Sequence, residues 1–129
     1  MTLETMTPNP GWDREANADV VETFAPLADE ITIKVWGGDW CGDCQDVLPD
    51  FGAALAAADV PTDRIVHYEV EKLEDGSKVG PKVDAYGIEY IPTIVIERDG
   101  KELVRFVEEE PVSAERYLAD RLRKVEASP

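Results

Sequence analysis

Long apolar runs are missing from this 129-residue chain. No stretch approaches the roughly 20 consecutive apolar residues that a transmembrane helix needs, so we expect no contact with membranes. Residues 1–12 contain neither a basic region nor an apolar segment, so we expect no secretory signal. These absences predict a cytoplasmic protein.

Basic residues are also scarce. The chain has 13 Lys and Arg against 28 Asp and Glu, which gives a formal net charge of −15. Nucleic-acid binding depends on cations that displace counterions from phosphates, so we expect no nucleic-acid partner. The acids are spread along the whole chain, which predicts a solvated acidic surface. An acidic protein of this kind resembles those of salt-loving organisms, where salt screens the repulsion.

Only two cysteines and one histidine are present, namely Cys41, Cys44 and His67. Two cysteines exclude a disulfide framework, and cytosolic thiols are usually kept reduced. A closed zinc site needs four ligands, so this chain would need carboxylates or a second chain to complete one. We therefore expect no metal. A cysteine pair that holds a metal across a homodimer, or serves only to bind a partner, stays open as an alternative.

Periodicity and turn signals predict a single domain over residues 13–129, preceded by an irregular arm at residues 1–12. The apolar fraction of 43% is ordinary for a globular protein. The predicted helices cover residues 14–28, 41–58, 81–86 and 113–125. The predicted strands cover residues 31–36, 64–70, 93–98 and 102–107, and residues 73–81 are predicted to form a polar loop.

The order of these elements predicts an α/β fold. The strands at 31–36 and 64–70 flank a helix, so this crossover makes them parallel. Asp99-Gly100 separates the last two strands and is typical of a hairpin turn, which makes them antiparallel. We expect a three-layer structure with a mixed sheet of four or five strands and helices on both faces. Residues 2–6 are the candidate for the fifth strand.

The spacing of Cys41 and Cys44 suits dithiol chemistry, because one helical turn brings the two sulfurs together. Cys41 is expected at the exposed start of a helix, where free N–H groups and the helix dipole stabilise an anion. Cys44 follows the apolar stripe of that helix and is expected to be buried. Cys41 would attack a substrate disulfide, and Cys44 would then resolve the mixed disulfide.

The segment Trp40-Cys41-Gly42-Asp43-Cys44, followed by Pro49, resembles the active site of the thioredoxin family. The resemblance runs from about residue 31 to residue 125. It implies a thioredoxin-like fold and a redox-active Cys41–Cys44 disulfide. It also implies a monomeric thiol–disulfide oxidoreductase that serves cell redox homeostasis and electron transport. Disulfide-containing proteins would be its substrates, and a flavin-dependent reductase or a low-molecular-weight thiol would supply electrons without a bound cofactor.

A second matching motif is Ile91-Pro92-Thr93, directly before a predicted strand. The resemblance implies that the Ile91–Pro92 peptide bond is cis and lies against the cysteines. Pro92 would then shape the substrate groove and expose the backbone of Ile91 to a substrate strand. Trp40 and Gly42 would form part of the same surface.

The chain departs from the family pattern where protons are handled. The buried acid usual six residues before the first cysteine is replaced by Val35. Asp43 stands between the cysteines, where its negative charge should disfavour the thiolates. The candidate proton acceptors are therefore Asp43 and His67, which aligns with a lysine common in the family. For His67 an ordinary strand position is the favoured interpretation.

Overall fold

Four strands form the central sheet, in the order β2-β1-β5-β6. The computed structural model describes residues 4–38, 40–75, 77–107 and 113–127. The strands are β1 (Ile31–Gly37), β2 (Ile65–Glu69), β5 (Thr93–Arg98) and β6 (Lys101–Val107). β1 pairs in parallel with β2 and antiparallel with β5, while β5 and β6 form the predicted antiparallel hairpin. This mixed sheet confirms the predicted α/β fold class.

The central strands carry the apolar runs. Ile31, Ile33 and Val35 of β1 are fully buried, as are Ile94 and Ile96 of β5. Strands covered on both faces are typically rich in β-branched residues, which explains why β1 and β5 lie inside the sheet. β2 and β6 lie at the edges and have mixed burial.

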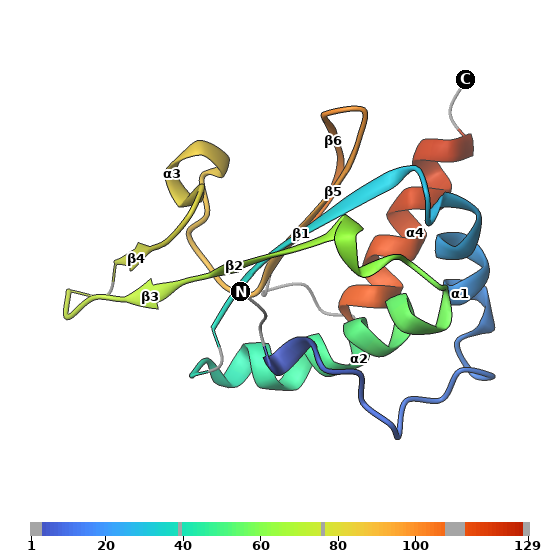
Figure 1. Ribbon diagram of the computed structural model, residues 1–129, viewed down its shortest axis with the longest axis horizontal. Helices are drawn as coiled ribbons and strands as arrows, with labels where there is room; N and C mark the ends of the chain where they lie inside the picture. The colour runs from blue at the N-terminus through green and yellow to red at the C-terminus, as the bar shows by residue number, and fades with distance from the viewer. Residues whose placement is uncertain (1–3, 39, 76, 108–112, 128–129) are drawn as a thin grey trace.

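Helices cover both faces of the sheet, as the sequence predicts. α1 (Ala18–Phe24), α2 (Gly42–Ala57) and α4 (Ala114–Ala127) pack against one another on one side, and α3 (Val83–Tyr86) lies on the other (Figure 1). The ring of Tyr86 in α3 lies 4.8 Å from the ring of Trp36 in β1. α2 continues through Pro49. None of the described helices is long and apolar enough to span a membrane.

The N-terminal segment differs from the prediction. Glu4–Met6 form a 3₁₀ turn rather than the suggested strand, while residues 2 and 3 lie outside the described part. This turn packs on α2, because a Cβ added at Gly52 would lie 2.2 Å from the carbonyl oxygen of Met6. α1 also begins later than predicted. The Asp13 carboxylate accepts a hydrogen bond from the N–H of Ala16 at 3.0 Å, and so closes a turn before the helix.

One strand of a small second sheet lies just before the segment that the sequence assigns to a polar loop, and the other lies within that segment. The sheet pairs β3 (Glu71–Lys72) with β4 (Lys78–Val79) in antiparallel orientation. Each strand has two residues and the pair is mostly polar, so the hydrophobic pattern gives no signal. This β3–β4 hairpin projects from the body of the molecule beside α3 (Figure 1).

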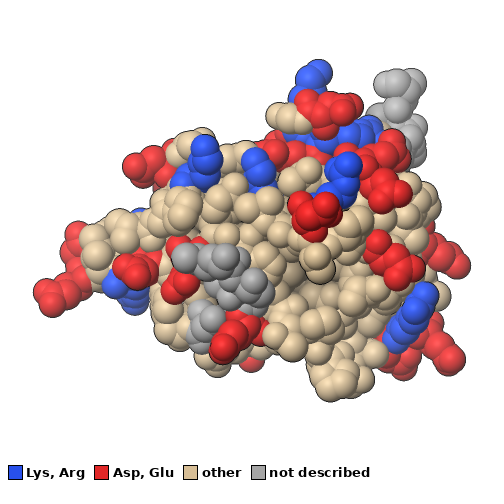
Figure 2. Space-filling model, viewed as in Figure 1, with Lys and Arg blue, Asp and Glu red and all other residues tan. Residues whose placement is uncertain are grey.

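Acidic side chains lie at many separate places on the face shown in Figure 2, and basic side chains are fewer. The distribution agrees with the expectation of a solvated acidic surface. Because basic residues are few, a place where two of them occur together is unusual on this surface.

Candidate active site

Cys41 is the N-cap residue of α2, and its backbone is extended. The backbone N–H of Cys44 donates a hydrogen bond to Sγ of Cys41 at 3.3 Å. A helix N-terminus with an N–H aimed at sulfur can stabilise negative charge that forms there during thiol exchange. Cys41 is only 7% exposed, so the predicted exposed position is wrong. The reason is that loops distant in the sequence form walls around it.

Cys44 lies one turn into α2 and is fully buried. Burial raises the pKa of the Cys44 thiol well above its usual range, and the hydrogen bond with Cys41 raises it further. The negative charge of Asp43 acts in the same direction as a smaller cause. Both cysteines are free thiols in this structure. The pair is therefore asymmetric, with one sulfur at a pocket and the other in the core.

The loop before β5 forms the opposite wall. The Ile91–Pro92 peptide bond is cis, as the resemblance implies. The carbonyl oxygen of Ile91 lies 3.9 Å from Sγ of Cys41, a distance compatible with a weak S–H···O hydrogen bond. Thr93 is buried, and its hydroxyl donates to the carbonyl of Tyr90, which ties the loop to the first residue of β5.

Trp40 forms the surface beside the cysteines and is 50% exposed. Its indole N–H donates to the carbonyl of Val70 at 3.0 Å. A Cβ at Gly38 would lie 2.5 Å from the indole nitrogen, so the ring packs directly over this glycine. Gly38 is a site residue that sequence reasoning did not single out, although the Gly37-Gly38 pair before Trp40 was a signal for it.

A pocket of about 250 Å³ opens at Cys41. It brings together most of the predicted site residues with two lysines that the sequence did not indicate. Its lining residues are Trp40, Cys41, Gly42, Asp43, Lys72, Lys78, Tyr90 and Ile91. Asp43 is exposed in the first turn of α2, close enough to influence Cys44 electrostatically.

His67 lies elsewhere. It is paired in register with Val35 of β1, but it belongs to β2, the outer strand of the sheet. His67 lines a cavity with Gly52 and Leu55 that is separate from the pocket of Cys41. Gly52 is eight residues beyond Cys44 in α2, roughly 12 Å along the helix axis. Val35 is fully buried where the family usually has an acid. Asp43 is therefore the predicted acceptor that the structure places beside the cysteines, and His67 is not.

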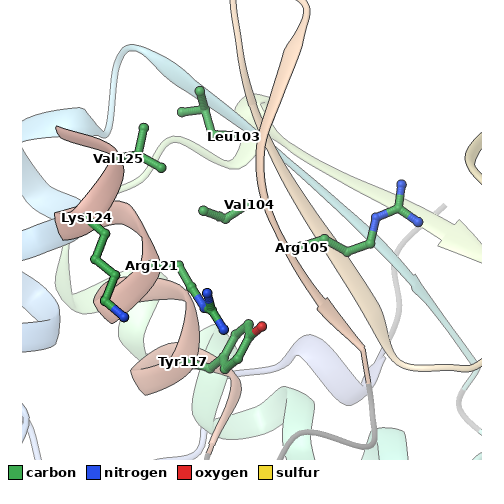
Figure 3. A pocket seen from close by; sticks show the side chains of 7 residues that line it. All are labelled: Leu103, Val104, Arg105, Tyr117, Arg121, Lys124 and Val125. Carbon is green, nitrogen blue, oxygen red and sulfur yellow. The ribbon is translucent and has the colours of Figure 1, made fainter. Parts of the chain in front are cut away.

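A larger cavity of about 380 Å³ lies between β6 and α4 (Figure 3). Arg121 approaches the ring of Tyr117 at 5.0 Å, and Arg105 extends away toward Glu102, which it contacts at 2.9 Å. The residues that line this cavity include no thiol and no carboxylate, so the cysteine pocket is the better candidate for chemistry. Among the described residues, no three His, Cys, Asp or Glu side chains gather into a metal-binding group.

A cysteine pair at the start of a helix, facing a cis-proline loop in an α/β sandwich, defines the class of thiol–disulfide oxidoreductases with the thioredoxin fold. A family model described as Thioredoxin matches residues 17–120. A thioredoxin from Chlamydia trachomatis serovar D is 31% identical over 87 residues, which cover 67% of this chain and 78% of the relative. This chain belongs to the thioredoxin family.

Solved structures support the fold. Mitochondrial thioredoxin 3 from Saccharomyces cerevisiae, in its oxidized form, has a TM-score of 0.52 at 17% identity, over 81% of this chain and 89% of that chain. A poplar thioredoxin h mutant has a TM-score of 0.51 at 16% identity, over 100% of this chain and 92% of that chain. At these identities the likeness concerns the fold alone.

Proposed function

We propose that this chain reduces disulfide bonds in protein substrates through Cys41 and Cys44. Cys41 attacks one sulfur of the substrate disulfide, the other sulfur leaves as a thiolate, and a mixed disulfide forms. Cys44 then attacks Cys41, which releases the second substrate sulfur and leaves a Cys41–Cys44 disulfide. The two electrons of the dithiol have passed to the substrate.

The observation that carries this proposal is the asymmetry of the pair. Sγ of Cys41 lines the pocket and accepts the N–H of Cys44, while Cys44 itself is fully buried. A substrate sulfur can therefore reach Cys41 first, and only the mixed disulfide presents a target to Cys44. The backbone of Ile91 lies where a substrate strand could pair beside Cys41.

Asp43 is the proposed acceptor of the proton that Cys44 loses. Burial and the Asp43 carboxylate both disfavour the Cys44 thiolate, so no stabilised thiolate at Cys44 holds the protein in the dithiol form, which favours a reductant over an oxidant. A flavin-dependent reductase or a low-molecular-weight thiol would return the protein to the dithiol form. We propose that the protein acts as a monomer in the cytoplasm. Its net charge of −15 fits a cytoplasm rich in salt, which screens the repulsion between the acidic side chains.

The test uses two single variants and a peptide disulfide. Cys41→Ser should abolish reduction of the peptide, whereas Cys44→Ser should accumulate a mixed disulfide at Cys41 that mass spectrometry detects. Retention of full activity by both variants would refute the mechanism. Metal analysis of protein purified without an affinity tag addresses the alternative, because near-stoichiometric zinc or iron would indicate a shared metal site.

A further inference from the structure

The β3–β4 hairpin contributes two cations to the pocket of the attacking cysteine. Lys72 and Lys78 both line the pocket that contains Cys41. The chain has only 13 Lys and Arg against 28 Asp and Glu, so two lysines in one small pocket are unusual for a protein that is acidic overall. The pocket has one carboxylate among its lining residues, that of Asp43.

The two lysines face each other across the hairpin. Lys72 of β3 is directly paired with Lys78 of β4, and paired residues project from the same face of a sheet. The neighbouring pair, Glu71 and Val79, therefore projects from the opposite face. Like charges directly opposite one another on paired strands are destabilising. The repulsion between Lys72 and Lys78 therefore costs this short hairpin stability. A bound ligand of opposite charge would offset that cost.

Both ends of the hairpin are anchored to the body of the protein by tryptophan side chains. The indole N–H of Trp40 donates to the carbonyl of Val70, just before β3. The indole N–H of Trp36 donates to the carbonyl of Pro81, just after β4, at 2.9 Å. Gly80 approaches the carbonyl oxygen of Glu69 so closely that a Cβ would lie 2.7 Å from it. These contacts fix the backbone at both ends of the hairpin whose two lysines line the pocket of Cys41.

The two ammonium groups are not committed to partners within the described part of the chain. No described carboxylate forms an ion pair with Lys72 or Lys78, whereas Lys34, Arg105, Arg116 and Arg123 all form ion pairs. The lysines are therefore available to a carboxylate that enters the pocket with a substrate.

We propose that Lys72 and Lys78 form a clasp for a carboxylate located next to the scissile disulfide. This inference rests on the proposed disulfide exchange at Cys41 and names its preferred substrate class, disulfides flanked by acidic groups. The clasp takes no part in the electron transfer. It lowers the cost of bringing an acidic substrate to a protein of net charge −15 and positions the substrate sulfur at Cys41.

Turnover of two matched peptide disulfides tests the clasp. One peptide carries Glu beside each cysteine and the other carries Gln. At low ionic strength, kcat/KM should be roughly threefold to tenfold higher for the Glu peptide, because two solvent-accessible ion pairs are involved. The variant Lys72→Gln/Lys78→Gln should reduce this ratio to about one, and Lys72→Arg/Lys78→Arg should restore it. Lys101→Gln, which removes one positive charge at the distant β5–β6 hairpin, should keep the wild-type ratio. A ratio that does not depend on Lys72 and Lys78 would overturn a clasp for acidic peptide segments.

A binding measurement separates failure of the clasp from failure of the proposed function. Cys41→Ser/Cys44→Ser protein cannot exchange disulfides, but Trp40 beside the pocket should still report binding by its fluorescence. Tighter binding of the Glu peptide that disappears in Lys72→Gln/Lys78→Gln would support the clasp even if neither peptide is reduced by the wild type. Equal binding of both peptides would overturn a clasp for acidic peptide segments.

The source of the carboxylate is distinguished by a second substrate pair, dithiodipropionate and its diamide. A lysine-dependent preference for dithiodipropionate without a preference between the peptides would assign the clasp to small carboxylate disulfides. A preference among the peptides would assign it to acidic protein segments. No lysine-dependent preference in either pair would contradict the proposal.

Discussion

The backbone N–H of Cys44 points at the sulfur of Cys41, 3.3 Å away. One helical turn therefore joins the two reactive residues by a direct hydrogen bond, while their environments differ. Cys41 lies at a pocket, and burial raises the pKa of Cys44. This difference should determine the order in which the two thiols react.

Alkylation of the reduced protein should modify Cys41 first. Cys44 should react at least about tenfold more slowly, because it is buried and little of it is thiolate. Because the pKa of Cys44 is raised, its thiolate is still a small fraction of the thiol at pH 9, so Cys44 should remain the slower of the two cysteines there. Iodoacetamide labelling followed by peptide mass spectrometry measures both rates. Equal labelling of the two cysteines in folded protein would contradict the assigned roles.

Replacement of Asp43 by Asn should slow resolution of the mixed disulfide by about tenfold or more if the carboxylate accepts the Cys44 proton. The lost negative charge also lowers the pKa of Cys44, but it is a minor cause beside burial. Stopped-flow measurement of substrate release gives the rate. His67→Gln is the matched control and should leave the rate unchanged, because His67 lines another cavity. Slowing by His67→Gln alone would reverse the assignment.

Lys34, Tyr86 and Glu97 form a polar cluster on the sheet face under α3. Lys34 Nζ lies 3.0 Å from Glu97 Oε1 and donates to the Tyr86 hydroxyl at 2.7 Å. Lys34→Met should cost about 2–3 kcal/mol of unfolding free energy, because it leaves the Glu97 carboxylate mostly buried without its cation. Urea denaturation measures the change. Lys101→Met, at an exposed position, should change stability by less than about 0.5 kcal/mol.

The same cluster should contribute to acid sensitivity. Burial raises the pKa of Glu97, but hydrogen bonds from Tyr86 and Lys34 outweigh burial and leave it below the usual 4.5. The cluster's contribution is therefore full above pH 4.5 and is lost as the pH falls through the lowered pKa. The stability difference between wild type and Glu97→Gln should shrink over that acidic window. A difference that is constant with pH would argue against an ionised Glu97.

The pKa of Glu115 is shifted in the opposite direction from that of Glu97. The Glu115 side chain is 3% exposed, and burial raises its pKa, although one oxygen accepts the indole N–H of Trp12 at 3.2 Å. A raised pKa in the folded state means that stability declines as the pH rises from the unfolded to the folded pKa. Glu115→Gln should therefore raise Tm at neutral pH, and the gain should vanish at low pH. Glu22→Gln, an exposed control on α1, should show neither effect.

The sequence predicted the features that depend on local pattern. The buried β-branched run of β1, the Asp99-Gly100 turn and the apolar stripe through Cys44 and Leu48 each correspond to the observed element. The cis peptide bond before Pro92 was implied by resemblance, since no local pattern distinguishes it.

The features that depend on distant segments were not predictable in this way. The enclosure of Cys41 comes from Lys72 and Lys78 on one side and from Tyr90 and Ile91 on the other, which only the fold brings together. The place of His67 depends on β2 being an outer strand, which the order of elements along the chain does not state. The β3–β4 hairpin lacks an apolar pattern, but its Asp75-Gly76 dipeptide is a turn signal like Asp99-Gly100 and could have revealed it.

The central claim is that Cys41 and Cys44 form a reversible redox pair that donates electrons. Titration of the purified protein against thiol–disulfide buffers, with alkylation and mass spectrometry to count free thiols, tests it most directly. We predict a two-electron transition at or below the cytosolic poise, roughly −220 to −320 mV. A reversible transition at a much less negative potential would contradict the assignment as a reductant. Absence of any Cys41–Cys44 transition would contradict the assignment as an oxidoreductase altogether.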